Sequence, residues 1–187
     1  MTTAATVSIP GCVAGVWDVD PVHSEVSFTV RHMMVSKVRG RFGTFSGQIV
    51  TGDDVTGSSV TASIDVASVD TGNEHRDTDL RSANFFDVEA YPRWTFRSTG
   101  VRVDGDGLVV DGDLTIKGVT RSASLALEVN GIGTDLSGGT RAGISASTTI
   151  DRNDFGVDVK LPLDGGGVVV GDKVRINLEI EAVLRQA

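Results

Sequence analysis

Apolar and polar residues alternate with a period of two in six segments of this chain, and few segments show the spacing of a long helix. In the first segment, polar residues separate Val26, Phe28 and Val30. The other five segments span residues 60–66, 108–116, 123–129, 142–150 and 174–182. Successive side chains of a strand point to opposite faces, so each segment has one apolar and one polar face. The pattern predicts antiparallel strands that curl around a shared apolar side.

The alternation changes parity once, between residues 38 and 50. Phe42 belongs to one parity and Phe45 to the other, so both cannot face inward on one regular strand. One extra residue near Gly43-Thr44 would form a β-bulge, which bends a strand around a closing sheet. We therefore expect a bent strand at this point.

The alternation is lost from residue 68 to residue 92. Two short helical turns fit this stretch, Asn73–Leu80 and Ser82–Phe86, because Asn73 and Ser82 are good N-cap residues. A long connection with its own aromatic residues is uncommon unless it covers or fills something. This segment is therefore expected to lie over an opening of the sheet.

Eight or nine strands result when the broken segments are counted, and they could form a closed barrel or a two-sheet sandwich. The inward residues are mostly small and aliphatic, and aromatic residues make up only 5% of the chain. Small inward residues, a bulge and a covering segment favour a barrel with room inside. The predicted fold is all-β: an extended antiparallel eight-stranded barrel with one or two short helices in the 72–90 connection. Such a barrel can hold one slender ligand.

The length of 187 residues fits one domain, which we place at 15–187 after a flexible tail at 1–14. The single Cys12 excludes an internal disulfide framework. No apolar run is long enough to span a membrane. The N-terminal residues lack the basic start and apolar core of a secretory signal, so the expected location is the cytoplasm.

The net charge of −8 argues against nucleic acid or an anionic membrane as the default partner. Four basic residues do lie close together in the sequence, Arg31, Lys37, Arg39 and Arg41. We expect strand alternation to scatter them over an exposed face, and we interpret them as a solvated surface.

Residues with catalytic or metal-binding chemistry are few. The three histidines, His23, His32 and His75, have no metal-ligand spacing, and no cofactor or metal is expected. His32 shares its parity with Val30 and should face inward, where it could contact a ligand head group or be a hydrogen-bonded core histidine.

Charged residues of mixed sign occur together in the long connection, at Arg76, Asp77, Asp79 and Arg81. Most such clusters are solvated helical turns. If they lie over the opening of a barrel, they could instead anchor the polar head of a ligand.

Three motifs of the chain resemble the YceI-like family of lipid-binding proteins, which is also described as polyisoprenoid-binding. The motifs are HSEVSFTVRHMMVSKVRGRF at 23–42, DTGNEHRDTDLRSANFFDVEAYP at 70–92 and GDLTIKGVTR at 112–121. The resemblance covers about Trp17 to Ala182. It implies a lipocalin-like barrel around an apolar tunnel for an isoprenoid or similar chain, no established catalytic activity, and dimers in some members.

Two departures limit what the resemblance implies. Many members carry a histidine where this chain has Asp79, so a histidine contact to the head group is not carried over. Many members are exported, whereas this chain shows no leader.

The leading hypothesis is a carrier, storage or stress-related protein that binds an isoprenoid or other long-chain amphiphile without being an enzyme. Its expected partners are that lipid and, as the resemblance allows, a second copy of the chain; nucleic acid and an integral membrane segment are not expected. Inward parity and the apolar content of 23–45 and 80–96 predict the ligand-binding residues Val26, Phe28, Val30, His32, Met33, Met34, Phe42, Phe45, Leu80, Phe85, Phe86, Trp94 and Phe96. Met33, Met34, Phe85 and Phe86 are expected to guard the opening.

Two other functions compete with lipid binding. An enzyme acting on a lipid-like substrate would use His32 and a carboxylate as acid and base. A structural β module would assemble through its edges and have no internal cavity.

Overall fold

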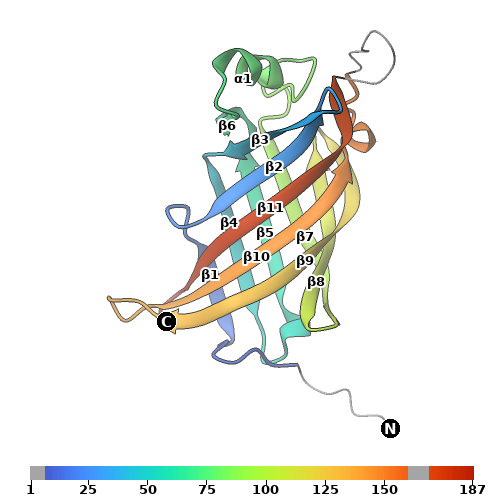
Figure 1. Cartoon of the computed structure of the whole chain (residues 1–187). Helices are drawn as coiled ribbons and strands as arrows, with labels where there is room; N and C mark the ends of the chain where they lie inside the picture. Colours follow the sequence, from blue (N-terminus) through green and yellow to red (C-terminus); the bar gives the residue numbers. More distant parts are fainter. Residues whose placement is uncertain (1–6, 160–168) are drawn as a thin grey trace.

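The computed structural model describes residues 7–159 and 169–187, which form a closed antiparallel β-barrel with one α-helix at one end (Figure 1). The strands are β1 (Gly15–Val19), β2 (Glu25–His32), β3 (Ser36–Phe42), β4 (Phe45–Thr51), β5 (Ser59–Asp65), β6 (Val69–Asp70), β7 (Arg93–Asp104), β8 (Gly107–Ile116), β9 (Val119–Thr134), β10 (Thr140–Asp151) and β11 (Val170–Leu184). The helices are α1 (Glu74–Arg81) and the short 3₁₀ helices η1 (Val55–Gly57), η2 (Val66–Ser68) and η3 (Arg152–Phe155).

Eight strand positions close the barrel because two of them are each filled by two shorter strands. β1 and β2 both pair with β11, through Trp17 opposite Leu184 and Val30 opposite Val174. In the same way β3 pairs with β2, and β4 pairs with β1. The ring continues through β5, β7, β8, β9 and β10 to β11. The predicted eight-stranded antiparallel barrel is confirmed.

The change of parity near Gly43-Thr44 coincides with the break between β3 and β4. The break is two residues long: Gly43 donates a backbone hydrogen bond to Ser68, and Thr44 accepts one from Asp65. The strand is therefore interrupted here instead of carrying one extra residue. The interruption turns both Phe42 and Phe45 toward the interior.

The 68–92 connection covers the end of the barrel that lies at the top of Figure 1. The side chain of Asn73 caps α1, as predicted, by accepting a hydrogen bond of 3.0 Å from the backbone of Arg76. The prediction of a second helical turn at 82–86 was wrong. Ser82 ends α1 as its C-cap in an extended conformation (ψ 164°), and the following residues form turns that bring Asp87 to a positive φ of 50°.

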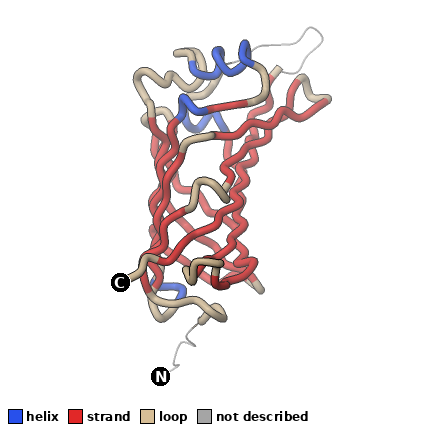
Figure 2. The backbone as a smooth tube through the Cα atoms, turned by 90° about the vertical axis from the view of Figure 1, so that its left-hand side faces the viewer, coloured by secondary structure: helices blue, strands red, loops and turns tan. Residues whose placement is uncertain are grey.

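Two groups of buried apolar side chains lie at different ends of the barrel. The larger one gathers residues of β2, β3, β7 and β8 under η2, β6 and the turn after α1. At its centre the Trp94 ring lies 5.0 Å from Phe42 and 4.8 Å from Phe86, both edge-to-face. The smaller group is built around Trp17 and Ala182, where β1 meets the end of β11. The tube in Figure 2 shows the strands between these two ends.

The described residues before β1 lie at the end opposite α1 (Figure 1). Residues 1–6 lie outside the described residues. Val7 accepts a backbone hydrogen bond from Val55, and Gly11 lies against Ile132. The flexible tail at 1–14 and the domain at 15–187 stay predictions. No helix in the described part of the chain is long and apolar enough to cross a membrane.

Candidate functional site

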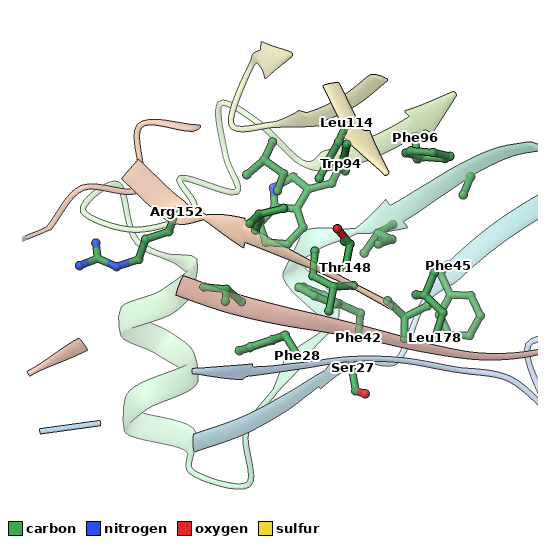
Figure 3. A pocket seen from close by; sticks show the side chains of 18 of the residues that line it. Ser27, Phe28, Phe42, Phe45, Trp94, Phe96, Leu114, Thr148, Arg152 and Leu178 are labelled. Atoms are coloured by element: carbon green, nitrogen blue, oxygen red, sulfur yellow. The ribbon is translucent and has the colours of Figure 1, made fainter. Parts of the chain in front are cut away.

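A cavity of about 400 Å³ occupies the interior of the barrel, and its walls are almost entirely apolar. Every strand position of the ring contributes to it, with aliphatic side chains such as Leu125, Ile144 and Ile176. Figure 3 shows the aromatic residues Phe28, Phe42 and Trp94 around this space. Because the walls offer few hydrogen-bonding groups, the cavity suits a hydrocarbon chain better than a polar molecule.

Most of the residues predicted from parity do line this cavity. They are Val26, Phe28, Val30, His32, Phe42, Phe45, Leu80, Phe85, Phe86, Trp94 and Phe96. The inward face of β2 supplies four of them, from Val26 to His32, because the period of two is unbroken along this strand.

Met33 and Met34 lie elsewhere, in the turn between β2 and β3, and are not in the lining. They are 44% and 52% exposed and have positive φ angles of 49° and 60°. The turn breaks the alternation of β2, so parity cannot be extended past His32. The expected position of the two methionines at the cavity opening is therefore corrected: they project to solvent beside it.

Two glycines make room for aromatic rings inside the barrel, which parity alone did not indicate. A Cβ on Gly40 would lie 2.3 Å from Cζ of Phe28, and one on Gly112 would lie 2.4 Å from Cζ of Phe96. Each ring therefore lies against the backbone of the facing strand and does not project into the middle of the cavity. The feature that could have indicated this arrangement is a glycine on the neighbouring strand, directly opposite or diagonal to an inward phenylalanine.

Charged side chains line the cavity only near α1 and the ends of β2 and β10. Among the described residues they belong to Arg76, Asp79 and Arg152, and His32 lies with them, whereas Arg31 borders the same end and its exposed side chain has the outward parity of β2. Arg76 is held in place because its guanidinium donates to the hydroxyl (2.7 Å) and carbonyl (2.9 Å) of Thr71. The lining is thus amphipathic, with one long apolar part and one charged end.

The four charged residues predicted as one cluster have different roles. Arg76 and Asp79 line the cavity, whereas Asp77 is 4% exposed and accepts hydrogen bonds from the backbone (2.9 Å) and hydroxyl (2.5 Å) of Thr71. Arg81 donates to the carbonyls of Ala67 (2.9 Å) and Val69 (3.0 Å) and ties α1 to the barrel. Of these four residues, only Arg76 and Asp79 can reach a ligand in the cavity.

Arg152 closes the same end of the barrel and was missed in the sequence. It is 6% exposed, and its guanidinium donates to the carbonyls of Val157 (2.6 Å), Gly171 (2.9 Å) and Val170 (3.2 Å) and to the Asp172 carboxylate (3.2 Å). It joins η3 to the first residues of β11. No sequence pattern indicated this role of Arg152, because the groups that it contacts are mostly backbone carbonyls of irregular segments.

His32 lines the cavity but has no acidic partner there. Among residues 7–159 and 169–187, no carboxylate lies within ion-pair distance of its ring. The described structure therefore does not assemble the acid–base pair that the enzyme hypothesis requires.

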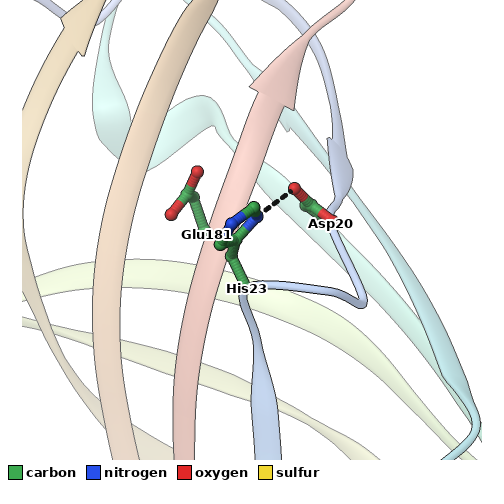
Figure 4. A group of neighbouring side chains, drawn as sticks. All are labelled: Asp20, His23 and Glu181. Atoms are coloured by element: carbon green, nitrogen blue, oxygen red, sulfur yellow. Dashed lines mark hydrogen bonds and ion pairs between the residues drawn. The ribbon is translucent and has the colours of Figure 1, made fainter. Parts of the chain in front are cut away.

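A second cluster of titratable groups, Asp20, His23 and Glu181, lies on the outer surface (Figure 4). Their ligand atoms are within 4.8 Å of one another, but Arg141 donates to both carboxylates at 2.8 Å and to Asp135 at 2.7 Å. The hydrogen bonds from His23 and Arg141 hold the pKa of Asp20 well below its usual range. The hydrogen bond to Asp20 raises the pKa of His23. Arg141 therefore pairs with both carboxylates of this cluster, which forms an ion-pair network around its guanidinium.

Comparison with known proteins gives consistent matches. The model of the YceI-like domain family matches residues 17–182. A UPF0312 protein of Staphylococcus aureus (strain N315) is 35% identical over 165 residues, which are 87% of this chain and 94% of that protein.

Solved structures share the barrel. BcnA of Burkholderia cenocepacia is 27% identical with a TM-score of 0.75, covering 87% of this chain and 98% of BcnA. A YCEI protein of Campylobacter jejuni is 28% identical with a TM-score of 0.70, covering 83% and 90%. A polyisoprenoid binding domain from Saccharophagus degradans has a TM-score of 0.68 and covers 92% and 100%; at 20% identity it shows similarity of fold alone.

Proposed function

The chain belongs to the family of YceI-like domains, and from this premise we propose that it binds one isoprenoid or other long-chain amphiphile inside its barrel. It would act as a carrier, storage or stress-related lipid-binding protein and not as an enzyme. The observation that carries the proposal is the cavity of about 400 Å³ with a long apolar wall and a single charged end.

The energetics of this lining favour a flexible apolar chain. Each methylene group transferred from water to the cavity contributes about 0.8 kcal/mol, so affinity needs few polar contacts. The charged end offers Arg76 and Asp79 to a polar head group. The S. degradans domain with the same fold is described as polyisoprenoid binding, which supports this ligand class.

One buried donor also favours a ligand that carries oxygen. The indole Nε1 of Trp94 is buried and has no hydrogen-bond partner among the described residues, and the ring lines the cavity. An unsatisfied buried donor costs about 1–3 kcal/mol, which a ligand hydroxyl, carbonyl or phosphoryl oxygen would recover. Replacing Trp94 by Phe should therefore weaken an oxygen-bearing ligand about tenfold and leave a pure hydrocarbon unaffected.

The competing functions have less support. The structural module predicts no internal cavity, which the cavity described above contradicts. The enzyme requires a partner for His32 that the described residues do not supply. The cytoplasmic location and the homodimer stay predictions, which cell fractionation and size-exclusion chromatography would check.

The direct test is solvent extraction of the purified protein followed by mass spectrometry. A stoichiometric isoprenoid or similar amphiphile is expected. The matched variants lie on one strand, β10: Ala146→Trp fills the cavity, and Thr149→Trp places the same ring on the exposed outer side. We expect Ala146→Trp to lose the lipid with a stability cost below about 1 kcal/mol, and Thr149→Trp to keep it.

Two outcomes would contradict the proposal. One is an extract without any lipid from the unmodified protein. The other is a loss of about 1–3 kcal/mol in the free energy of unfolding of Ala146→Trp, which is what overpacking of a filled core produces.

A further inference from the structure

The outer face of the β2–β3 hairpin carries a concentrated positive charge. The register places Arg31 opposite Lys37, Thr29 opposite Arg39 and Ser27 opposite Arg41. Directly opposed residues of an antiparallel pair point to the same face, so pairing gathers the four basic side chains instead of scattering them as the sequence suggested. All four are exposed. We call Arg31, Lys37, Arg39 and Arg41 the basic face.

The acidic residues on this outer side lie at one edge of the basic face: Asp70 beside Arg41, and Glu25 opposite Glu179. Arg41 pairs with Asp70 at 3.2 Å, but within the described part of the chain Arg31, Lys37 and Arg39 form no ion pair. Arg175 on the neighbouring β11 lies opposite Thr29 and extends the charge. Like charges directly across a strand pair, such as Arg31 and Lys37, destabilise a sheet, so the fold itself does not explain them. They stand out in a chain whose net charge is −8.

The tip of the same hairpin is apolar and exposed. Met33, Met34 and Val35 are 44%, 52% and 84% exposed, and we call them the apolar tip. Both methionines occupy left-handed backbone, at φ 49° and 60°, where a turn ordinarily carries Asn and Gly. Three consecutive solvent-exposed apolar residues in a strained turn serve neither the core nor the turn geometry.

The apolar tip lies beside the charged end of the cavity. It follows His32, which lines the cavity, and the backbone amide of Met33 donates to the carbonyl of Val169, another lining residue, at 2.8 Å. Figure 1 places this turn at the same end of the barrel as α1. A surface that held the tip would therefore hold the cavity opening against itself.

We propose that this hairpin docks on a lipid bilayer that contains anionic lipid. The apolar tip enters the boundary between head groups and acyl chains, and the basic face rests on the anionic head groups. Nucleic acid or an acidic protein would satisfy the basic face alone, whereas a bilayer accounts for the methionines and the charges together. Docking goes beyond lipid binding in the barrel and does not depend on what the cavity holds.

The test is co-flotation of the full chain with vesicles. Vesicles of mixed phosphatidylcholine and phosphatidylglycerol should carry the protein upward, whereas vesicles of phosphatidylcholine alone should not. High salt should release it, because screening weakens contacts between exposed charges. Equal binding to both kinds of vesicle, or to neither, overturns the proposal.

Two pairs of variants separate the tip from the charges. Met33→Asn with Met34→Gly installs residues that suit the turn, so the hairpin keeps its fold while vesicle affinity falls about tenfold. Its control is Leu136→Asn, an exposed apolar residue in the turn between β9 and β10, which should change nothing. Figure 1 shows this turn at the end opposite α1. Arg31→Glu with Lys37→Glu should weaken binding by about thirtyfold or more. Its control is Arg93→Glu with Arg97→Glu, the same change of net charge on the outer side of β7.

The cavity variant keeps this proposal separate from the proposed function. Ala146→Trp should still float with anionic vesicles although it no longer holds lipid. If the unmodified protein retains an extractable lipid but does not float, docking is overturned and lipid binding stands. Binding to duplex DNA in place of vesicles also overturns docking.

Discussion

The two ends of the barrel are closed in different ways. At the end opposite α1, the paired strands β1, β4 and β11 bring Trp17 and Ala182 together at 2% and 0% exposure. At the end with α1, separate short segments cover the opening and are held by arginine side chains that donate to backbone carbonyls, those of Arg81 and Arg152. The first end is closed by barrel strands packed around Trp17, whereas the second has the larger apolar cluster, around Trp94, beneath separate segments that these hydrogen bonds hold.

This difference indicates where a ligand enters. Opening the end around Trp17 would break the pairing of β1 with β11 and β4 as well as expose a buried tryptophan, which is costly. At the α1 end the covering segments can move by breaking individual side-chain hydrogen bonds and the contact of Phe86 with Trp94, without loss of pairing between the long strands. This end also carries the charged lining residues Arg76 and Asp79. We therefore expect the end opposite α1 to govern stability and the α1 end to govern lipid exchange.

The largest effect is expected from Trp17→Ala at the packed end. The change removes a buried ring and the hydrogen bond of 3.0 Å from its Nε1 to the hydroxyl of Thr51. The free energy of unfolding, measured by urea denaturation, should fall by about 3–5 kcal/mol. A loss below about 1 kcal/mol would show that this end is not a packed core.

Arg152→Leu at the covered end should have the next largest effect. It leaves the carbonyls of Val157 and Gly171 without their donor, and the free energy of unfolding should fall by about 2–3 kcal/mol. The rate of lipid release should also rise in Arg152→Leu, which distinguishes this variant from Trp17→Ala. Arg152→Lys should not restore either quantity, because one ammonium cannot span carbonyls that a planar guanidinium reaches. Release at the unchanged rate would contradict the role of this end in exchange.

A smaller change of opposite sign is expected from Met33→Asn with Met34→Gly. Both positions have positive φ, which Asn and Gly adopt at lower cost than methionine. The free energy of unfolding should rise by about 1 kcal/mol while vesicle binding falls. A variant that is less stable than the unmodified chain would show that the methionines support the fold.

The smallest effect is expected at the His23–Asp20 pair. The bond to Asp20 raises the pKa of His23, so the pair stabilises the folded state fully below the unfolded pKa of about 6.5. This contribution is lost as pH rises through the raised folded pKa. The Tm difference between the unmodified chain and His23→Gln should therefore be positive in mild acid and vanish in alkali. A difference that does not change with pH would contradict this sign.

The sequence predicted most of the strand architecture and much of the cavity lining. Val26, Phe28 and Val30 line the cavity as parity predicts, because the period of two is a local property that persists along an unbroken strand. Asn73 was correct because an N-cap depends on the few residues next to it. Met33 and Ser82 were misjudged because a turn and a C-cap changed the local geometry there.

Other features depended on partners distant in the sequence. Arg152 is a closing residue because β11 brings Gly171 against η3, and nothing near Arg152 indicates this contact. Whether the basic residues of β2 and β3 scatter or gather depends on the register of the hairpin. Trp94 became an unsatisfied donor only when Phe42 and Phe86 packed around it.

The sequence by itself determined that this chain forms amphipathic antiparallel strands with one apolar side, one capped helix and a family resemblance in three motifs. Only the tertiary structure decided that the apolar side encloses an amphipathic cavity, that one end is packed and the other covered, and that a basic face ends in an apolar tip. The physical reason is that alternation and capping act between neighbours in the chain. Cavities, ion pairs and surface charge arise where strand register brings distant residues together.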